Sequence, residues 1–201
     1  MRGSSSVGGK AVLFATSNPG KLEEARMILA PFGLSLEQYD GKGTEIQADT
    51  NSEVAAHASR GAAIAAGRPV LVEDAGLYVE RLKGFPGPYS AYAFKTIGVG
   101  GIIALLRSST RVGGKERAAR FVSSVAYCEP RGEPLLFEGS VRGKITRRPK
   151  GKKGFGFDPI FAADGSTKTF GELTLEEKCA VSHRGEAMRR FATWYVSRDR
   201  R

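Results

Sequence analysis

A short apolar run near the N-terminus is followed by a stretch with helical spacing. Residues 11–16 (AVLFAT) are almost all apolar, which predicts a buried strand. Residues 17–33 then place apolar side chains along one face of a helix. Ser17 or Asn18 suits the N-cap of this helix, and Pro19 suits its first turn. We therefore expect a strand that runs into a capped helix.

Polar residues at helix ends support this helix and a second one. The acidic pair 23–24 favours the positively polarised N-terminal end of the first helix, and Gly33 is expected to end it. Thr50 and Glu53 have the spacing of a capping box, and the second helix should stop at the glycine and proline within residues 67–69.

The rest of the chain mixes strands and helices without strict alternation. Residues 69–77 (PVLVEDAGL) form a β-rich run, and residues 85–98 form a turn that leads into a helix, with another helix after it. Residues 118–146 hold two strand-like runs, and residues 182–198 form an amphipathic helix. We expect an α/β fold with a mixed sheet.

Composition favours one ordinary globular domain. The chain has 201 residues, 41% of them apolar, and no apolar run of membrane-spanning length. Residues 1–10 are expected to be a flexible tail rather than a signal peptide, and residues 11–201 to be a single domain. Two cysteines, Cys128 and Cys179, are too few for a disulfide framework, so a cytoplasmic location is expected.

The net charge of +10 indicates an anionic partner, such as nucleotide phosphates, nucleic acid or a membrane surface. Much of the excess comes from the run 147–153 and from the C-terminal residues 197–201. A basic surface that only keeps the protein soluble explains the charge equally well.

The first candidate site is the segment 16–21 (TSNPGK), where a strand enters a helix. Free N–H groups at the helix start attract anions, and Lys21 adds a mobile positive charge. The segment is not a Walker A loop. An ordinary capped helix with a surface lysine is the alternative.

The second candidate site is the acidic pair Glu73 and Asp74. We expect it at the carboxyl edge of a buried strand, where α/β sheets usually bind ligands. Two carboxylates can hold Mg²⁺ or orient a water molecule, and their side chains should diverge toward different subsites. A solvated turn is the alternative. Glu45 is a third acid, on a predicted loop.

The third candidate site is the stretch KGFGFDPIF, residues 153–161. Its first five residues resemble the RNA-stacking strand of an RRM domain. Asp158 and Pro159 favour a turn, so a central strand should stop there. What remains is a glycine-rich loop in which Phe155, Phe157 and a carboxylate suit a single base. A turn with two core phenylalanines is the alternative.

The fourth candidate site combines Lys178 with Ser182, His183 and Arg184. Ser182 is a natural N-cap for the last helix, and His and Arg donors beside a helix start suit purine oxygens or phosphates. A surface histidine is the alternative. Zinc is rejected because no further ligand completes a set with His183 and Glu186.

Six motifs in this order are similar to those of the inosine/xanthosine triphosphate pyrophosphatase family. The resemblance runs from about residue 12 to residue 191, over the motifs TSNPGKLEEA, EIQ, PVLVEDAGL, GFPGPYSAY, GKKGFGFDPIF and EKCAVSHRGEA. It implies an elongated α/β fold with two lobes around a cleft, a homodimer, and Mg²⁺-dependent hydrolysis of ITP, dITP and XTP to the monophosphate and pyrophosphate. No stable nucleic-acid partner is expected. The chain departs from the family at Ala75, where many members have serine, and at Ala58, where some have lysine.

The resemblance also implies roles for individual residues. Asp74 would activate the attacking water as the catalytic base. Glu45, Glu73 and Asp74 would position the metal. The implied substrate-binding positions are Ser17, Asn18, Lys21, Ala75, Phe155, Gly156, Phe157, Asp158, Lys178, Ser182, His183 and Arg184.

Two other functions compete with this one. The basic charge and KGFGF favour a module that binds single-stranded nucleic acid. A pyrophosphatase of another family, such as a dUTPase-like or pyrimidine-specific enzyme, is the third possibility.

The leading hypothesis also predicts how the substrate is selected. His183 or Arg184 donates a hydrogen bond to the 6-oxo group of a purine. The amino group of adenine at the same position would leave these donors unpaired.

Overall fold

The structure is a computed structural model that describes residues 10–41, 46–107 and 114–198. Glu45 lies outside the described residues, as do residues 1–9 of the predicted tail. Lys10, the last residue of that predicted tail, is the first residue of the first strand.

A seven-stranded mixed sheet forms the centre of the molecule, as the sequence predicts. The spatial order is β2-β1-β3-β5-β6-β7, and β4 pairs with β3. β2, β1 and β3 are parallel, whereas β3, β5, β6 and β7 pair antiparallel. The strands are β1 (Lys10–Ala15), β2 (Leu34–Tyr39), β3 (Val70–Val79), β4 (Pro86–Gly87), β5 (Ala118–Cys128), β6 (Leu135–Ile145) and β7 (Phe161–Ala163).

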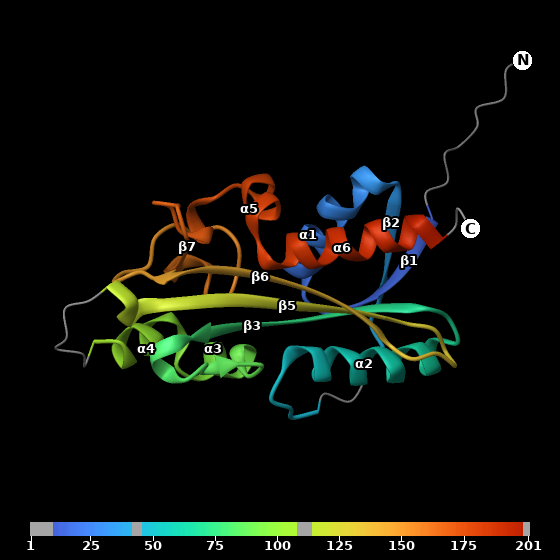
Figure 1. Cartoon of the computed structure of the whole chain (residues 1–201), viewed down its shortest axis with the longest axis horizontal. Helices are drawn as coiled ribbons and strands as arrows, with labels where there is room; N and C mark the ends of the chain where they lie inside the picture. The colour runs from blue at the N-terminus through green and yellow to red at the C-terminus, as the bar shows by residue number, and fades with distance from the viewer. Residues whose placement is uncertain (1–9, 42–45, 108–113, 199–201) are drawn as a thin grey trace, which may run out of the picture.

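Helices cover both faces of this elongated sheet (Figure 1). One face carries α1, α5 and α6, while α2 and the pair α3 and α4 lie beneath opposite ends of the long strands. Their bounds are α1 (Pro19–Leu29), α2 (Asn51–Ala66), α3 (Ser90–Thr96), α4 (Gly98–Leu105), α5 (Leu175–Val181) and α6 (His183–Arg198). Among the described residues, no helix is both long and apolar enough to cross a membrane.

Two of the predicted helix starts are confirmed at atomic detail. Asn18 caps α1 by accepting hydrogen bonds from the N–H groups of Gly20 and Lys21. Thr50 and Glu53 form the predicted capping box at the start of α2. These caps were predictable because their partners lie within one helical turn.

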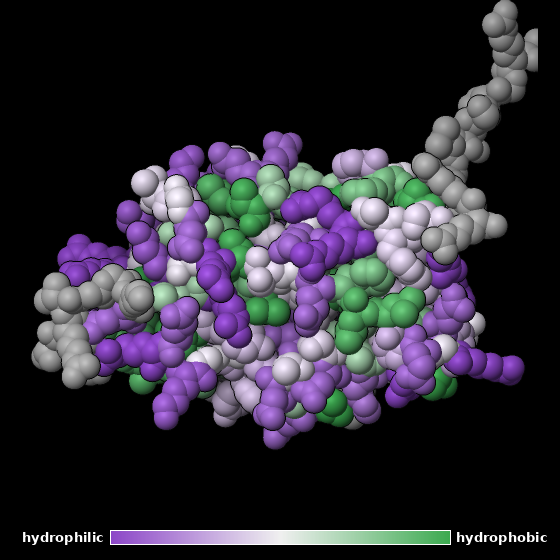
Figure 2. All heavy atoms as spheres, in the orientation of Figure 1, coloured by the Kyte–Doolittle hydropathy of each residue, from purple (hydrophilic) through white to green (hydrophobic). Residues whose placement is uncertain are grey.

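Separate hydrophobic clusters fill the two ends of the molecule, as expected for two lobes. One cluster packs α1 and α6 against β1, β2 and the adjoining ends of β5 and β6. Another packs α3, α4 and β7 against the opposite ends of β5 and β6. On the face shown in Figure 2, polar side chains cover much of the surface, with apolar patches between them.

The start of α6 lies directly on β6, and a glycine makes this contact possible. A Cβ atom on Gly139 would lie 2.2 Å from the carbonyl oxygen of His183 and 2.6 Å from the amide nitrogen of Ala187. Both neighbours are helix backbone, which cannot move independently of α6. The contact therefore fixes the first turn of α6, with His183 and Arg184, over the middle of the sheet.

We predict that Gly139→Ala lowers the free energy of unfolding by about 1–3 kcal/mol, because it overpacks a backbone contact. Urea unfolding followed by circular dichroism measures this change. Gly61→Ala is the matched control, since a Cβ at this exposed position in α2 meets nothing within 4 Å. Helix propensity should make the control slightly more stable, and a wild-type stability for Gly139→Ala would contradict the packing argument.

Candidate active site

The candidate site forms beside a gap in the edge of β3. β1 pairs with β3 only as far as Val72, and β4 does not pair with β3 until Leu77. β3 nevertheless continues to Val79, because its pairing with β5 runs along its whole length. The prediction that the strand ends at its two acids was therefore wrong. At the gap, the Nζ of Lys21 donates to the backbone carbonyl of Glu73 at 3.0 Å.

Glu73 is buried at this gap and faces two cations. Its Oε1 accepts from the Ser123 hydroxyl at 2.6 Å and lies 3.0 Å from Nη2 of Arg184. Its Oε2 accepts no hydrogen bond among the described residues, but lies 2.9 Å from Nζ of Lys21. Burial alone raises the pKa of Glu73, but Arg184, then Lys21 and Ser123, hold it well below its usual range. Glu73 is therefore a carboxylate.

Glu24 on α1 extends this arrangement into a buried ion-pair network. Its two carboxylate oxygens accept from Lys178 Nζ and from Arg184 Nη1, each at 2.6 Å. Lys178 also donates to Asp158, whose pKa is raised by burial against the opposing effect of Lys178. The expectation that Glu24 serves the helix end was wrong, since its side chain is only 2% exposed. It holds α5 and α6 to α1 instead.

His183 is buried next to this network rather than lying on the surface. Its ring stacks on Phe121, with centroids 4.6 Å apart. Burial, followed by the charge of Arg184, lowers its pKa well below the ordinary value, so the imidazole is neutral at neutral pH. Among the described residues, neither Nδ1 of His183 nor Nε of Arg184 has a hydrogen-bond partner. Unpartnered buried polar atoms are rare in folded proteins, so these two atoms indicate a place where a water molecule or a ligand supplies the partner.

The glycine-rich segment 153–158 forms a turn, not a strand. Gly154 and Gly156 both have positive φ, which suits glycine and breaks an extended chain. Asp158 closes the turn by accepting from the N–H of Phe155. The resemblance to an RNA-stacking strand was therefore misleading.

The two phenylalanines of this turn lie in different environments. Phe157 is 3% exposed and packs edge-to-face against Phe94, so the interpretation as a core residue holds for this ring. Phe155 lies over the polar network, with its ring centroid 4.6 Å from Lys178 Nζ and 5.4 Å from the guanidinium of Arg184. Phe155 therefore offers an aromatic face beside the buried donors.

Asp74 belongs to a different set of contacts from Glu73, as the divergence of side chains along a strand predicts. The amide of Asn51, at the start of α2, donates to Oδ2 of Asp74 at 2.6 Å. The hydroxyl of Tyr78 donates in turn to Oδ1 of Asn51 at 2.6 Å. The carboxyl group of Asp74 is thereby held in one orientation by a buried amide.

A cavity of about 300 Å³ brings these groups together. Its wall includes most of the predicted substrate-binding positions together with Asp74. The predicted residues on the wall are Asn18, Lys21, Asp74, Ala75, Phe155, Gly156, Phe157, Asp158, Lys178, His183 and Arg184. Their roles toward a substrate stay predictions.

Three predicted residues among the described ones lie off the cavity wall. Ser17 is exposed, and Ser182 is buried and caps α6 by accepting from the N–H of Gly185. Glu73 lies behind the wall, held by Arg184.

Sequence reasoning missed several residues of the site. Glu24 was interpreted as a charge at the end of a helix, but it pairs with Arg184. Asn51 directly follows the N-cap residue Thr50, and nothing in the local sequence indicated its hydrogen bond to Asp74. Ser90, Phe94 and Lys95 come from α3, where only the GFPGPYSAY motif gave a signal.

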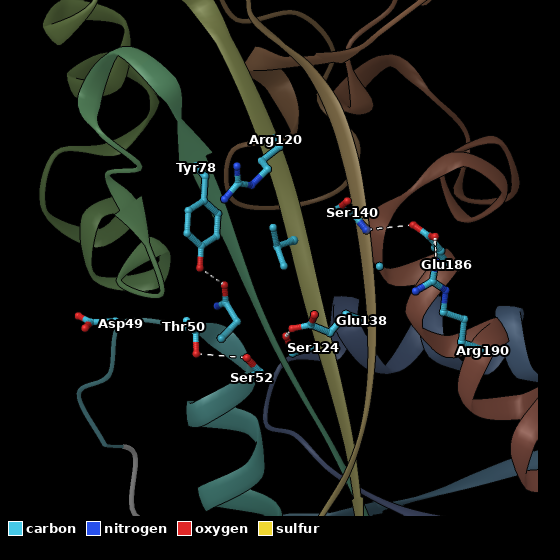
Figure 3. Close-up of a pocket in the computed structure, with 13 residues that line it drawn as sticks. Asp49, Thr50, Ser52, Tyr78, Arg120, Ser124, Glu138, Ser140, Glu186 and Arg190 are labelled. Carbon is cyan, nitrogen blue, oxygen red and sulfur yellow. Dashed lines mark hydrogen bonds and ion pairs between the residues drawn. The ribbon is translucent and has the colours of Figure 1, made fainter.

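A second, larger hollow of about 640 Å³ lies on the sheet between α2 and α6 (Figure 3). On its wall, Arg190 forms an ion pair with Glu186, and the hydroxyl of Ser124 donates a hydrogen bond to Glu138. Among the described residues, none of its ionisable side chains is fully buried. A concave wall with buried, incompletely partnered donors is more typical of a ligand site, so we assign the site to the smaller cavity.

Comparisons with known proteins show the family of this chain. The model of the Ham1 family matches residues 12–194. The chain belongs to the Ham1 family. It is 52% identical to the dITP/XTP pyrophosphatase of Methanopyrus kandleri, over 92% of this chain and 95% of that protein. It is 50% identical to the dITP/XTP pyrophosphatase of Thermococcus kodakarensis, over 90% and 95% of the two chains.

Solved structures of similar proteins share the fold of this Ham1-family chain. A HAM1 protein from Coxiella burnetii superposes with a TM-score of 0.81 at 29% identity, covering 94% of this chain and 99% of that one. A dITP/XTP pyrophosphatase from Mycobacterium abscessus gives 0.69 at 34% identity, covering 90% and 98%. The family resemblance and the α/β fold expected from the sequence are both confirmed.

Two expectations about the first candidate site, residues 16–21, need correction. The N–H groups of Gly20 and Lys21 are not free, because both donate to the side chain of Asn18. The ammonium group of Lys21 is not mobile either, because it is tied to the carboxylate and the carbonyl of Glu73. An Asn N-cap satisfies the orphan donors that a phosphate would otherwise meet.

The fit of a magnesium ion to this site rests on Asp74. Among the described residues, no group of three or more His, Cys, Asp or Glu side chains is placed to hold a metal. Mg²⁺ does not need such a cage, since it is usually bound by one or two carboxylates together with substrate phosphates. Asp74 on the cavity wall meets this requirement, whereas Glu73 Oε2 faces Lys21. Glu45 and Glu73 as ligands stay predictions.

Neither cysteine belongs to the reacting groups. Cys128 and Cys179 are both buried, and burial raises the pKa of the Cys179 thiol to about 11. A thiol with that pKa is protonated at neutral pH and is a poor nucleophile.

We predict that buried His183 makes the protein less stable below about pH 6.5, the ordinary pKa of histidine. The unfolded chain takes up a proton there and the folded chain does not, so the free energy of unfolding falls by about 1.4 kcal/mol per pH unit. Chemical unfolding between pH 7.5 and about pH 5, above the ordinary carboxylate range, measures this slope.

The comparison of two variants isolates the effect of His183. His183→Gln should flatten this part of the stability profile, while His57→Gln, at the exposed second histidine, should keep the wild-type slope. A His183→Gln profile parallel to that of the wild type would show that the buried ring is not the cause.

Proposed function

We propose that this protein hydrolyses the non-standard purine nucleotides dITP, ITP and XTP to the monophosphate and pyrophosphate. The observation that carries the proposal is the pair of buried, unpartnered polar atoms on His183 and Arg184, beside the aromatic face of Phe155. The relatives named dITP/XTP pyrophosphatase support it at high identity over nearly the whole chain.

The buried donors explain selection for a 6-oxo purine. A guanidinium N–H of Arg184 donates only, and the neutral imidazole of His183 donates from one of its nitrogens. A 6-oxo group accepts such hydrogen bonds, whereas the 6-amino group of adenine leaves the donors unpaired. An unmade hydrogen bond of a buried group costs about 1–3 kcal/mol, which disfavours ATP.

Asp74 is the base of the proposed reaction. Its carboxylate takes a proton from a water molecule whose oxygen forms a bond to the α-phosphorus. The bond from that phosphorus to the oxygen bridging to the β-phosphate breaks, and pyrophosphate leaves with the electron pair. Asn51 supports this role by holding the carboxyl group in one orientation through Oδ2.

The proposal includes Mg²⁺, held by Asp74 together with the substrate phosphates. When bound, the ion would neutralise charge that develops on the phosphate oxygens. The proposal also places the enzyme in the cytoplasm, where unpaired cysteines such as Cys128 and Cys179 stay reduced.

We predict that the wild-type protein releases pyrophosphate from dITP or XTP much faster than from ATP. We also predict that the kcat of Asp74→Asn is lower than that of the wild type by at least about a hundredfold, as expected for removal of a general base. A coupled pyrophosphate assay measures both. Asp164→Asn, at an exposed acid away from the cavity, is the control and should keep wild-type activity. Equal rates with ATP, release of orthophosphate, or near-normal kcat in Asp74→Asn would refute the assignment.

Nucleic-acid binding has no comparable support. Phe157, one of the two rings that suggested it, is buried, and the segment that carries both rings is a turn. A stacking platform needs exposed rings on adjacent positions of a sheet or groove. The positive charge alone does not distinguish a polynucleotide from a nucleotide.

The proposed assembly is a homodimer that uses the apolar segment at α3. Phe85, Tyr89, Tyr92 and Ile97 are all more than 40% exposed, and Tyr92 reaches 71%. Large exposed apolar side chains that lie together are typical of an interaction surface.

We predict that Tyr92→Arg converts the dimer into a monomer, because it introduces an unpaired charge into an apolar interface. Analytical ultracentrifugation measures the mass of each species. Ile64→Arg is the matched control, since Ile64 is 63% exposed on α2, and this variant should stay dimeric. A monomeric wild type, or a dimeric Tyr92→Arg protein, would refute this surface.

A further inference from the structure

The positive charges around the cavity are mostly cancelled by buried acids. Among the described residues, the cationic side chains on its wall are Lys21, Lys95, Lys178 and Arg184. Lys178 and Arg184 share Glu24. The remaining acids of the network are Asp158, which pairs with Lys178, and Glu73, which pairs with Lys21 and Arg184.

This cancellation leaves little charge for the phosphates of a nucleotide. Three of the four cations face three buried carboxylates, so the network as a whole is close to neutral. The groups of the network other than Lys21, whose side chain is 18% exposed, are also almost fully buried. Releasing Lys178 or Arg184 would leave an uncompensated charge in the interior. The network is therefore suited to a neutral base and poorly suited to a polyphosphate.

Lys95 differs from the other cations of the cavity. It lies near the end of α3, its side chain is exposed, and it lines the same cavity as Asp74. Among the described residues, its ammonium group has no hydrogen bond or ion pair, unlike the ammonium groups of Lys21 and Lys178. An exposed lysine on a flexible stem can follow a phosphate group without breaking any contact of the folded protein.

We infer that Lys95 binds the phosphate groups of the substrate. It supplies a positive charge that the network lacks, because the cations of the network are already paired with carboxylates. The inference rests on the proposed function, because a triphosphate is the anion that must lie beside Asp74. Lys95 is then a substrate-binding residue on α3, a helix that contributes none of the site residues expected from the sequence.

Kinetics of charge variants give the first test. Lys95→Ala should raise KM for dITP by about tenfold or more, as expected for the loss of one charge-assisted hydrogen bond. Lys95→Arg should keep most of the wild-type KM, since it retains the charge. Lys144→Ala removes an exposed lysine from β6, away from the cavity wall, and should leave KM unchanged. A KM in Lys95→Ala equal to that of the wild type would overturn the inference.

Direct binding separates this inference from the proposed activity. Isothermal titration calorimetry with inorganic triphosphate as the phosphate probe, and with inosine as the base probe, needs no turnover. We expect Lys95→Ala to weaken triphosphate binding about tenfold and to leave inosine binding unchanged. Equal losses for both probes, or no loss for triphosphate, would overturn the role of Lys95. Failure of the wild type to cleave dITP would instead refute the proposed function and leave this binding test valid.

Discussion

The buried ion-pair network is the constraint on which the rest of the site depends. An ionised group in a protein interior is tolerated only when it is paired and hydrogen-bonded, and breaking one partner of a buried pair costs about 3–5 kcal/mol. The partners here come from α1, β3, the glycine-rich turn, α5 and α6, so the network assembles only when these elements are all in place. Its members are Lys21, Glu24, Glu73, Asp158, Lys178 and Arg184.

In the proposed function, the same network supports recognition of the base. Because its charges nearly cancel, it holds the guanidinium of Arg184 rigidly, next to the neutral ring of His183, without attracting anions strongly. Rigid donors with unused capacity suit the fixed pattern of a purine edge. The proposed catalytic base, Asp74, accepts a hydrogen bond from Asn51, which is not part of the network.

Local features of the fold were predictable, whereas the long-range contacts of the site were not. The Asn18 cap and the capping box of α2 depend on neighbours within one turn, and the sequence predicted both. The pairing of Glu24 with Arg184 joins positions 160 residues apart, so the sequence around Glu24 did not indicate that its side chain is buried. The strand through Asp74 was cut short because its register with β5 is also a long-range property. The order of the motifs identified the family, and only the three-dimensional structure showed which charges are already paired.

The most direct test of this account is a crystal structure of the protein with bound dIMP. We predict that the purine lies against Phe155, that the 6-oxygen contacts His183 or Arg184, and that the ion pairs of Glu24 and Glu73 remain as they are without ligand. A purine bound outside this cavity would contradict the account. So would a ligand that replaces Glu24 or Glu73 as the partner of Arg184, because the network would then be a set of competing ligands rather than a preformed support.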